Sequence, residues 1–171
     1  MKKAVLMVSL ALLSLGTFAQ HDHSKHNMSG DHGSSMAPEF QDENLQQAYT
    51  NYIALKDALV ASDAGTAEAK AAELVASLSK VENAESAQKS ATNVMKAGSL
   101  EAQRKAFASL STQMAELVRD AEISAGEVYV EFCPMANGGE GAHWLANEKQ
   151  INNPYFGDKM LRCGKVKETI K

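Results

Sequence analysis

The chain has 171 residues, a formal net charge of −4 at pH 7 and two cysteines. An acidic chain with few clustered basic residues argues against nucleic acid and anionic lipid surfaces as partners. Its length fits one domain with a hydrophobic core of useful size.

The first nineteen residues have the three parts of a secretory signal peptide. Lys2 and Lys3 are followed by an apolar run over 4–15 and by small residues up to Ala19. This run is shorter than the about 20 apolar residues that a membrane span needs. We therefore predict cleavage after Ala19, with no membrane insertion afterwards and a periplasmic or secreted location. Loss of the two lysines moves the formal charge from −4 to −6.

Residues 20–38 are polar, rich in glycine and serine, and lack apolar periodicity, which predicts a flexible tail. Short His-rich tracts bind metal ions, and imidazole suits Cu(II), Ni(II) or Zn(II). A secondary role in metal capture is one interpretation, and a solvated linker that binds nothing specific is the other. The histidines concerned are His21, His23, His26 and His32.

Four segments then carry apolar residues at helical spacing, within 45–59, 67–78, 87–95 and 100–118. Thr66 is the candidate N-cap of the second helix, and Ser99 after Gly98 is that of the fourth. Short links between such helices favour antiparallel packing. The predicted fold is mainly α, an antiparallel bundle of about four helices in a domain over 39–171.

The last fifty residues follow a different pattern. Residues 127–132 alternate polar and apolar side chains with β-branched and aromatic types, which predicts a strand. The Asn-Gly-Gly sequence at 137–139 predicts a turn, and the aromatic Trp144 and Tyr155 lie among further turns. We expect this strand and loop segment to pack against one end or side of the bundle.

The chemistry of this segment lies in four sulfur atoms. Cys133 and Met135 stand in C-x-M order, and Met160 and Cys163 follow in M-x-x-C order about 25 residues later. Thiolate and thioether groups are soft ligands that select Cu(I) over hard cations, whereas zinc more often takes further cysteines or histidines. The motif over about 127–164 therefore predicts a Cu(I) site, which His143 between the two halves would complete.

The same residues allow other interpretations. In an oxidising compartment Cys133 and Cys163 can form a disulfide, which would stabilise the fold by about 3–4 kcal/mol through loop closure. Methionines and aromatic residues often fill a hydrophobic core. On this interpretation the segment is a structural or interaction module that binds no metal. A thiol enzyme with Cys133 as nucleophile and His143 as base lacks an orienting third group, so no enzymatic activity is expected.

The runs over 133–137, 141–145 and 151–164 resemble the C-terminal signature of the DUF3347 domain. The resemblance extends over about 41–171. The family is typical of Bacteroidetes-type bacteria and is also found fused to adaptors of CusB-type heavy-metal efflux systems. It implies periplasmic copper handling, as a chaperone, a buffer or an accessory to efflux, with a heavy-metal efflux adaptor or exporter as the expected partner. The family supplies no established ligands. Carried onto this chain, the motif gives Cys133, Met135, Met160 and Cys163.

Overall fold

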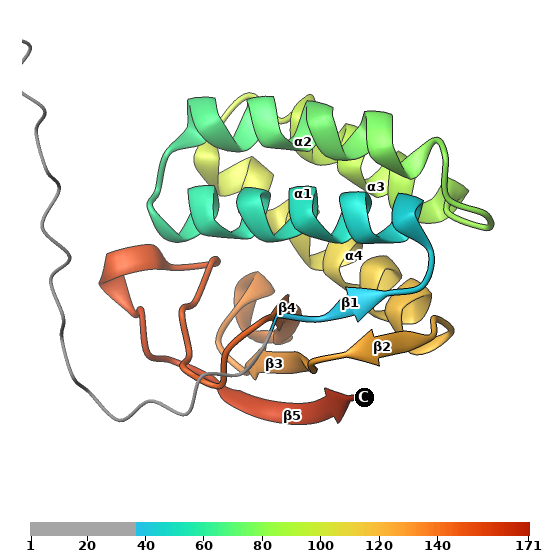
Figure 1. Cartoon of the computed structure of the whole chain (residues 1–171). Coiled ribbons are helices and arrows are strands. Elements are labelled where there is room, and N and C mark those ends of the chain that lie inside the picture. Colours follow the sequence, from blue (N-terminus) through green and yellow to red (C-terminus); the bar gives the residue numbers. More distant parts are fainter. Residues whose placement is uncertain (1–36) are drawn as a thin grey trace, which may run out of the picture. The chain divides into compact units, whose positions relative to one another are not determined.

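A computed structural model describes residues 37–171, which form four helices and, after them, a small sheet (Figure 1). The predicted signal peptide at 1–19 and the four histidines of the tail lie outside the described residues. The helices are α1 (Glu43–Val60), α2 (Ala64–Leu78), α3 (Glu85–Met95) and α4 (Leu100–Arg119). This confirms the predicted mainly helical bundle. Within residues 37–171 no helix has both the length and the apolar character that a membrane crossing requires.

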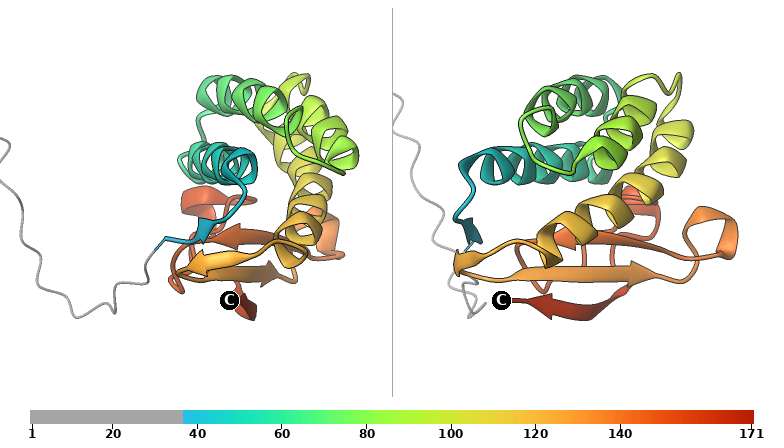
Figure 2. Two further views of the ribbon diagram at one scale, coloured as in Figure 1. Left: turned by 45° about the vertical axis from the view of Figure 1, so that its right-hand side comes forward. Right: turned by 90° about the vertical axis from the view of Figure 1, so that its right-hand side faces the viewer.

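The core forms where the apolar faces of the helices meet. Leu55 and Leu59 of α1 and Leu110 and Met114 of α4 are fully buried. Each helix packs against the next one along the chain, as expected for helices joined by short links. Figure 2 shows the helices on one side of the molecule and the strands on the other.

Side-chain caps fix where α2 and α4 begin. Asp63 caps α2, and its carboxylate accepts hydrogen bonds from the Thr66 backbone N–H at 3.0 Å and the Thr66 hydroxyl at 2.7 Å. The prediction that Thr66 is the N-cap was therefore wrong by three residues, because Thr66 donates to the cap. Ser99 caps α4 through the backbone N–H of Ala102 at 3.2 Å, as predicted.

Asp63→Ala is expected to lower the free energy of unfolding by about 1 kcal/mol, because the first N–H groups of α2 lose their acceptor. Asp63→Asn keeps an acceptor oxygen and is the matched control. Urea unfolding at pH 7, followed by circular dichroism, measures both variants. Equal losses for alanine and asparagine would show that the carboxylate charge, rather than the cap, stabilises the helix.

The strands form two antiparallel groups. β1 (Glu39–Phe40) pairs with β2 (Ile123–Ala125) in a short ribbon. β3 (Val128–Cys133) lies between β4 (Ala142–Ala146) and β5 (Lys165–Ile170) in a three-stranded sheet of order β4-β3-β5. Short 3₁₀ turns, η1 (Asn137–Gly139) and η2 (Gly157–Lys159), lie in the connections. The strand predicted at 127–132 is confirmed as β3, whereas the sequence analysis did not predict its partners.

Hydrogen bonds attach the sheet to the bundle through β4. The backbone N–H of Leu145 donates to the Tyr52 hydroxyl at 3.0 Å. That hydroxyl is also hydrogen-bonded to Ser111 of α4 at 2.8 Å. All three residues are fully buried, so the position of β4 on α1 and α4 is fixed by direct contacts in the core.

The long connection from β4 to β5 is held by two polar side chains. The buried Asn153 donates from its amide to the Cys163 carbonyl at 2.6 Å and accepts from the Tyr155 N–H at 2.8 Å. Arg104 of α4 donates to the carbonyls of Pro154 and Leu59, each at 2.8 Å. These bonds hold the chain near Cys163, shortly before it enters β5.

Candidate functional site

Cys133 and Cys163 lie in contact, with 3.2 Å between their sulfur atoms. Cys133 is the last residue of β3, and Cys163 lies just before β5. The β3–β5 register pairs Phe132 with Lys165, which brings the two cysteines together across a sequence separation of 30 residues. The Cys133 side chain is fully buried and Cys163 is half-buried, so Cys163 is the more accessible of the two thiols.

Both sulfur motifs are tight turns. The carbonyl of Cys133 accepts from the Ala136 N–H at 3.4 Å, and the carbonyl of Met160 accepts from the Cys163 N–H at 3.0 Å. The first and fourth residues of such a turn lie within about 7 Å at their Cα atoms. Met160 and Cys163 are therefore close in space as well as in sequence.

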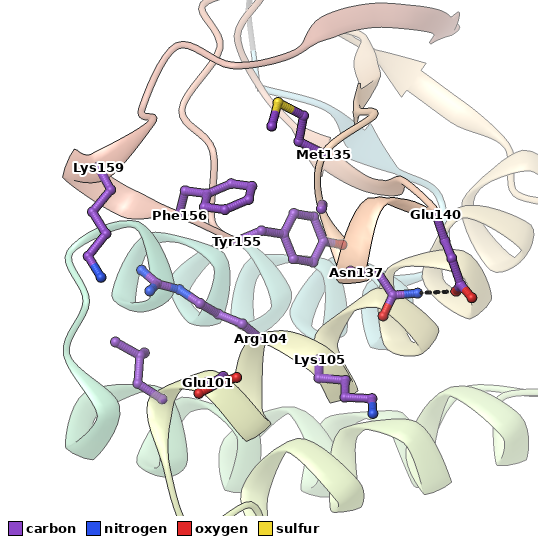
Figure 3. Close-up of a pocket in the computed structure, with 12 residues that line it drawn as sticks. Glu101, Arg104, Lys105, Met135, Asn137, Glu140, Tyr155, Phe156 and Lys159 are labelled. Carbon is purple, nitrogen blue, oxygen red and sulfur yellow. Dashed lines mark hydrogen bonds between the residues drawn. The ribbon is translucent and has the colours of Figure 1, made fainter.

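Met135 has a different environment from Met160. The Met135 side chain is 56% exposed, and among residues 37–171 it is the one large apolar side chain on the surface. Met160, by contrast, is half-buried at the end of η2. Met135 lines a pocket of about 840 Å³ together with Tyr155 and Phe156, which face α4 residues including Arg104 (Figure 3). The structure thus places Met160 one turn from Cys163 and Met135 on the wall of this pocket. This pocket was not among the features predicted from the sequence.

His143 points away from the thiols. Its strand partner is Phe132, whereas the partner of Cys133 is Ala142. Successive side chains on a strand point to opposite faces of the sheet, so His143 and Cys133 lie on different faces. The His143 ring packs on Phe132 with 4.6 Å between ring centroids. The expectation that His143 completes the sulfur site does not agree with this geometry.

The surroundings of His143 and Cys163 disfavour the charged form of each side chain. Burial and the nearby Arg119 and Lys167 lower the pKa of His143. The hydrogen bond with Cys133, together with burial, raises the pKa of the Cys163 thiol. Across residues 37–171, no three His, Cys, Asp or Glu side chains converge in a way that could hold a metal ion. Among the described residues, a metal at the thiol pair would thus have the two thiolates and no further His, Cys, Asp or Glu side chain as ligands.

Glu131 is a buried acid that the sequence analysis did not consider. It lies two residues before Cys133 on the same face of β3, and its strand partner is Trp144. Among the described residues, neither its carboxylate oxygens nor the Trp144 indole nitrogen forms a hydrogen bond of good geometry, although the indole lies near enough to lower the pKa of Glu131. The buried Lys56 contributes a nearby positive charge, but its ammonium lies 2.9 Å from Asp57. An acidic residue within an otherwise apolar strand is the sequence feature that predicts such a buried carboxylate.

Trp144, the single tryptophan, also packs beside the thiol pair. A Cβ atom built on Gly164, the residue after Cys163, would lie 2.8 Å from the Trp144 ring. Only glycine fits there without a shift of the ring or of the chain. The fluorescence of Trp144 is therefore placed to report on events at Cys163.

Comparison with known proteins places the helical part of the chain in a family. Residues 48–126 match the family described as a protein of unknown function, DUF3347. Residues 48–126 are a DUF3347 domain. No curated protein and no solved structure matches the chain.

The DUF3347 match confirms the resemblance but covers a different part of the chain from the motif that suggested it. It runs from within α1 through α4 to the end of β2 and stops before Cys133. The DUF3347 helices supply the framework, since Tyr52 holds β4 and Arg104 holds the loop before Cys163. The two thiols themselves come from the segment that follows the matched region.

Proposed function

We propose that this chain is an exported soft-metal-binding protein that holds Cu(I) between the thiolates of Cys133 and Cys163. It would act as a chaperone, a buffer or an accessory to heavy-metal efflux. The observation that supports the proposal is the 3.2 Å contact between two sulfur atoms from distant parts of the sequence. The signal-like residues 1–19 support export.

The geometry of the pair suits a soft ion after a small adjustment. A metal–thiolate bond of about 2.3 Å implies that a linear S–Cu–S unit separates its sulfurs by roughly 4.6 Å. Cys163 lies in a half-buried turn and is better placed to move than Cys133 in the core. Met160, the first residue of the same turn, is the motif thioether nearer to Cys163 in the sequence. Met135 belongs to the pocket wall and is proposed only as an outer donor.

The affinity for Cu(I) is expected to rise with pH. Binding requires the thiolate, and the pKa of Cys163 is raised by its hydrogen bond with Cys133 and by burial. Below that pKa, each ion bound displaces the Cys163 proton, so log K rises by about one per pH unit from this group alone. Competition with a Cu(I) chelator at pH 6, 7 and 8 measures the slope. An affinity independent of pH would contradict thiolate ligation by Cys163.

An anaerobic titration of the reduced mature protein with Cu(I) tests the proposal. We expect one tightly bound ion per chain and a change in Trp144 fluorescence that reaches its end point at one equivalent. Removal of residues 20–36 is expected to leave this tight binding intact and to weaken only the capture of Cu(II) by His21, His23, His26 and His32. Loss of tight Cu(I) binding on truncation would move the site to the tail.

The second candidate function is a structural or interaction module with a Cys133–Cys163 disulfide and no metal. The same 3.2 Å contact favours it, because a disulfide needs the two sulfurs to approach by little more than 1 Å. The intact mass of protein taken from its own compartment separates the two proposals. A deficit of two hydrogens indicates the disulfide module, and the added mass of copper indicates the metal-binding protein.

A further inference from the structure

We propose that Cys163 is a covalent modification site for anionic low-molecular-weight disulfides, and that Cys133 is the sulfur that resolves the attached group. The inference rests on the thiol pair of the proposed function, and it does not depend on Cu(I) binding. It assigns different roles to the two cysteines.

The two thiols differ in their access to solvent. Cys133 is fully buried at the end of the central strand, whereas Cys163 is half-buried in a turn. In thiol–disulfide exchange the protein thiolate attacks one sulfur of the reagent in line with the reagent's S–S bond. The reagent must therefore come into contact with the thiol, so a buried thiol reacts only after local opening of the structure. Reagents from solution therefore meet Cys163 first.

The charge around Cys163 selects the reagent. Residues 159–167 contain four basic side chains and no acidic one, although the whole chain has a net charge of −4. All four are exposed. Lys159 directly precedes the turn that carries Cys163, and Arg162 lies within it. Lys165 and Lys167 lie on the Phe132 face of the sheet and add only a longer-range field. Two acids flank this stretch of the sequence. Glu168 forms an ion pair with Arg119 at 2.8 Å, so Asp158 is the flanking acid whose charge opposes the basic side chains. The basic residues, named here the basic segment, are Lys159, Arg162, Lys165 and Lys167.

The exchange proceeds in two balanced steps. The Cys163 thiolate attacks one sulfur of a disulfide RSSR, which forms a Cys163–SR mixed disulfide and releases RS⁻. The Cys133 thiolate then attacks the Cys163 sulfur, which forms the Cys133–Cys163 disulfide and releases the second RS⁻. Two thiols of the protein are oxidised and one external disulfide is reduced to two thiols. The 3.2 Å separation puts Cys133 within reach for the second step.

The roles are tested on the reduced full-length chain with Cys133→Ser and Cys163→Ser. With dithiodipropionate, Cys133→Ser is expected to accumulate a stable mixed disulfide at Cys163. Cys163→Ser is expected to react at least about tenfold more slowly, because its thiol is buried. Peptide mapping of the wild-type chain after brief exposure and acid quenching adds a measurement that needs no variant. Equal rates for the two variants, or a mixed disulfide mapped to Cys133, would overturn the proposal.

The preference for anions is tested with three small disulfides of similar size on Cys133→Ser. These are the dianionic dithiodipropionate, the neutral bis(2-hydroxyethyl) disulfide and the dicationic cystamine. Because all three react with the same thiol, its own pKa cancels from the comparison. We expect the anion to react about tenfold faster than the cation at low salt, and the ratio to approach one in concentrated salt.

A second substitution in the Cys133→Ser background locates the source of the charge preference. Lys159→Glu reverses one charge of the basic segment directly before the Met160–Cys163 turn, and Lys89→Glu makes the same change at an exposed position of α3 as the matched control. The first is expected to lower the anion-to-cation rate ratio, and the second to leave it unchanged. A ratio near one before any substitution, or an equal fall in both variants, would overturn the assignment of anionic reagents. Failure of the Cu(I) titration would leave these rates unaffected, so the two proposals fail separately.

Discussion

Replacing Cys133 or Cys163 by serine is expected to weaken Cu(I) binding by at least about a hundredfold. A serine hydroxyl is a hard, un-ionised donor at neutral pH and cannot replace a soft thiolate. Loss of a direct ligand should exceed the 10–100-fold effect that outer-shell substitutions have on metal affinity. Competition with a Cu(I) chelator under anaerobic conditions measures both variants against the wild-type chain.

The methionines provide graded controls for this experiment. Met160→Leu removes the thioether closest to Cys163 along the chain and is expected to weaken binding by about tenfold. Met135→Leu removes a sulfur from the exposed wall of the pocket and is expected to change the affinity by less than about threefold. Cysteine variants that bind as the wild type does would place the site outside the thiol pair. A larger effect from Met135 than from Met160 would place the ion at the pocket.

Glu131→Gln is expected to stabilise the fold by about 2–4 kcal/mol at pH 9 and to have little effect at pH 4. Burial raises the pKa of Glu131 from 4.5 to about 8, an increase that the charge of Lys56 opposes. Below pH 4.5 the folded and unfolded chains both carry the proton. As the pH rises towards 8 the unfolded chain releases it and the folded chain keeps it. The stability that protonated Glu131 contributes is therefore fully present below pH 4.5 and is lost as the pH rises through its folded pKa of about 8.

Urea unfolding of the reduced protein at pH 4, 7 and 9 measures this effect. Glutamine keeps the shape of the side chain and removes the ionisation, so the wild type should lose stability relative to the variant as the pH rises. Glu82→Gln, at an exposed position between α2 and α3, is the matched control and should not change the pH dependence. If Glu131→Gln is less stable than the wild type at pH 9, the buried carboxylate has a favourable partner when charged.

The helical half of the fold was predictable because its signal is local. Residues such as Leu110 and Met114 recur at the helical period, and the structure buries them on one face of α4. The helix boundaries were less certain, because Asp63 and Thr66 are both residues that favour caps. Only the structure shows that Asp63 is the acceptor and Thr66 the donor.

The sheet and the site depend on pairing that spacing along the chain does not reveal. Strand β5 carries two apolar and four polar residues, and its partner β3 lies more than 30 positions earlier. The sequence placed His143 between the two sulfur motifs, but a shift of one residue along a strand moves a side chain to the opposite face. For the same reason the contact between Cys133 and Cys163 was a hypothesis until the β3–β5 register was known.

X-ray absorption at the copper edge, on the Cu(I)-loaded wild-type chain, shows which atoms bind the ion. We expect two or three sulfur atoms at about 2.3 Å around the copper, with no imidazole among its ligands. A spectrum with nitrogen ligands and the scattering pattern of histidine rings would contradict this expectation, and would place copper on histidines instead of the two thiols that meet at the end of β3.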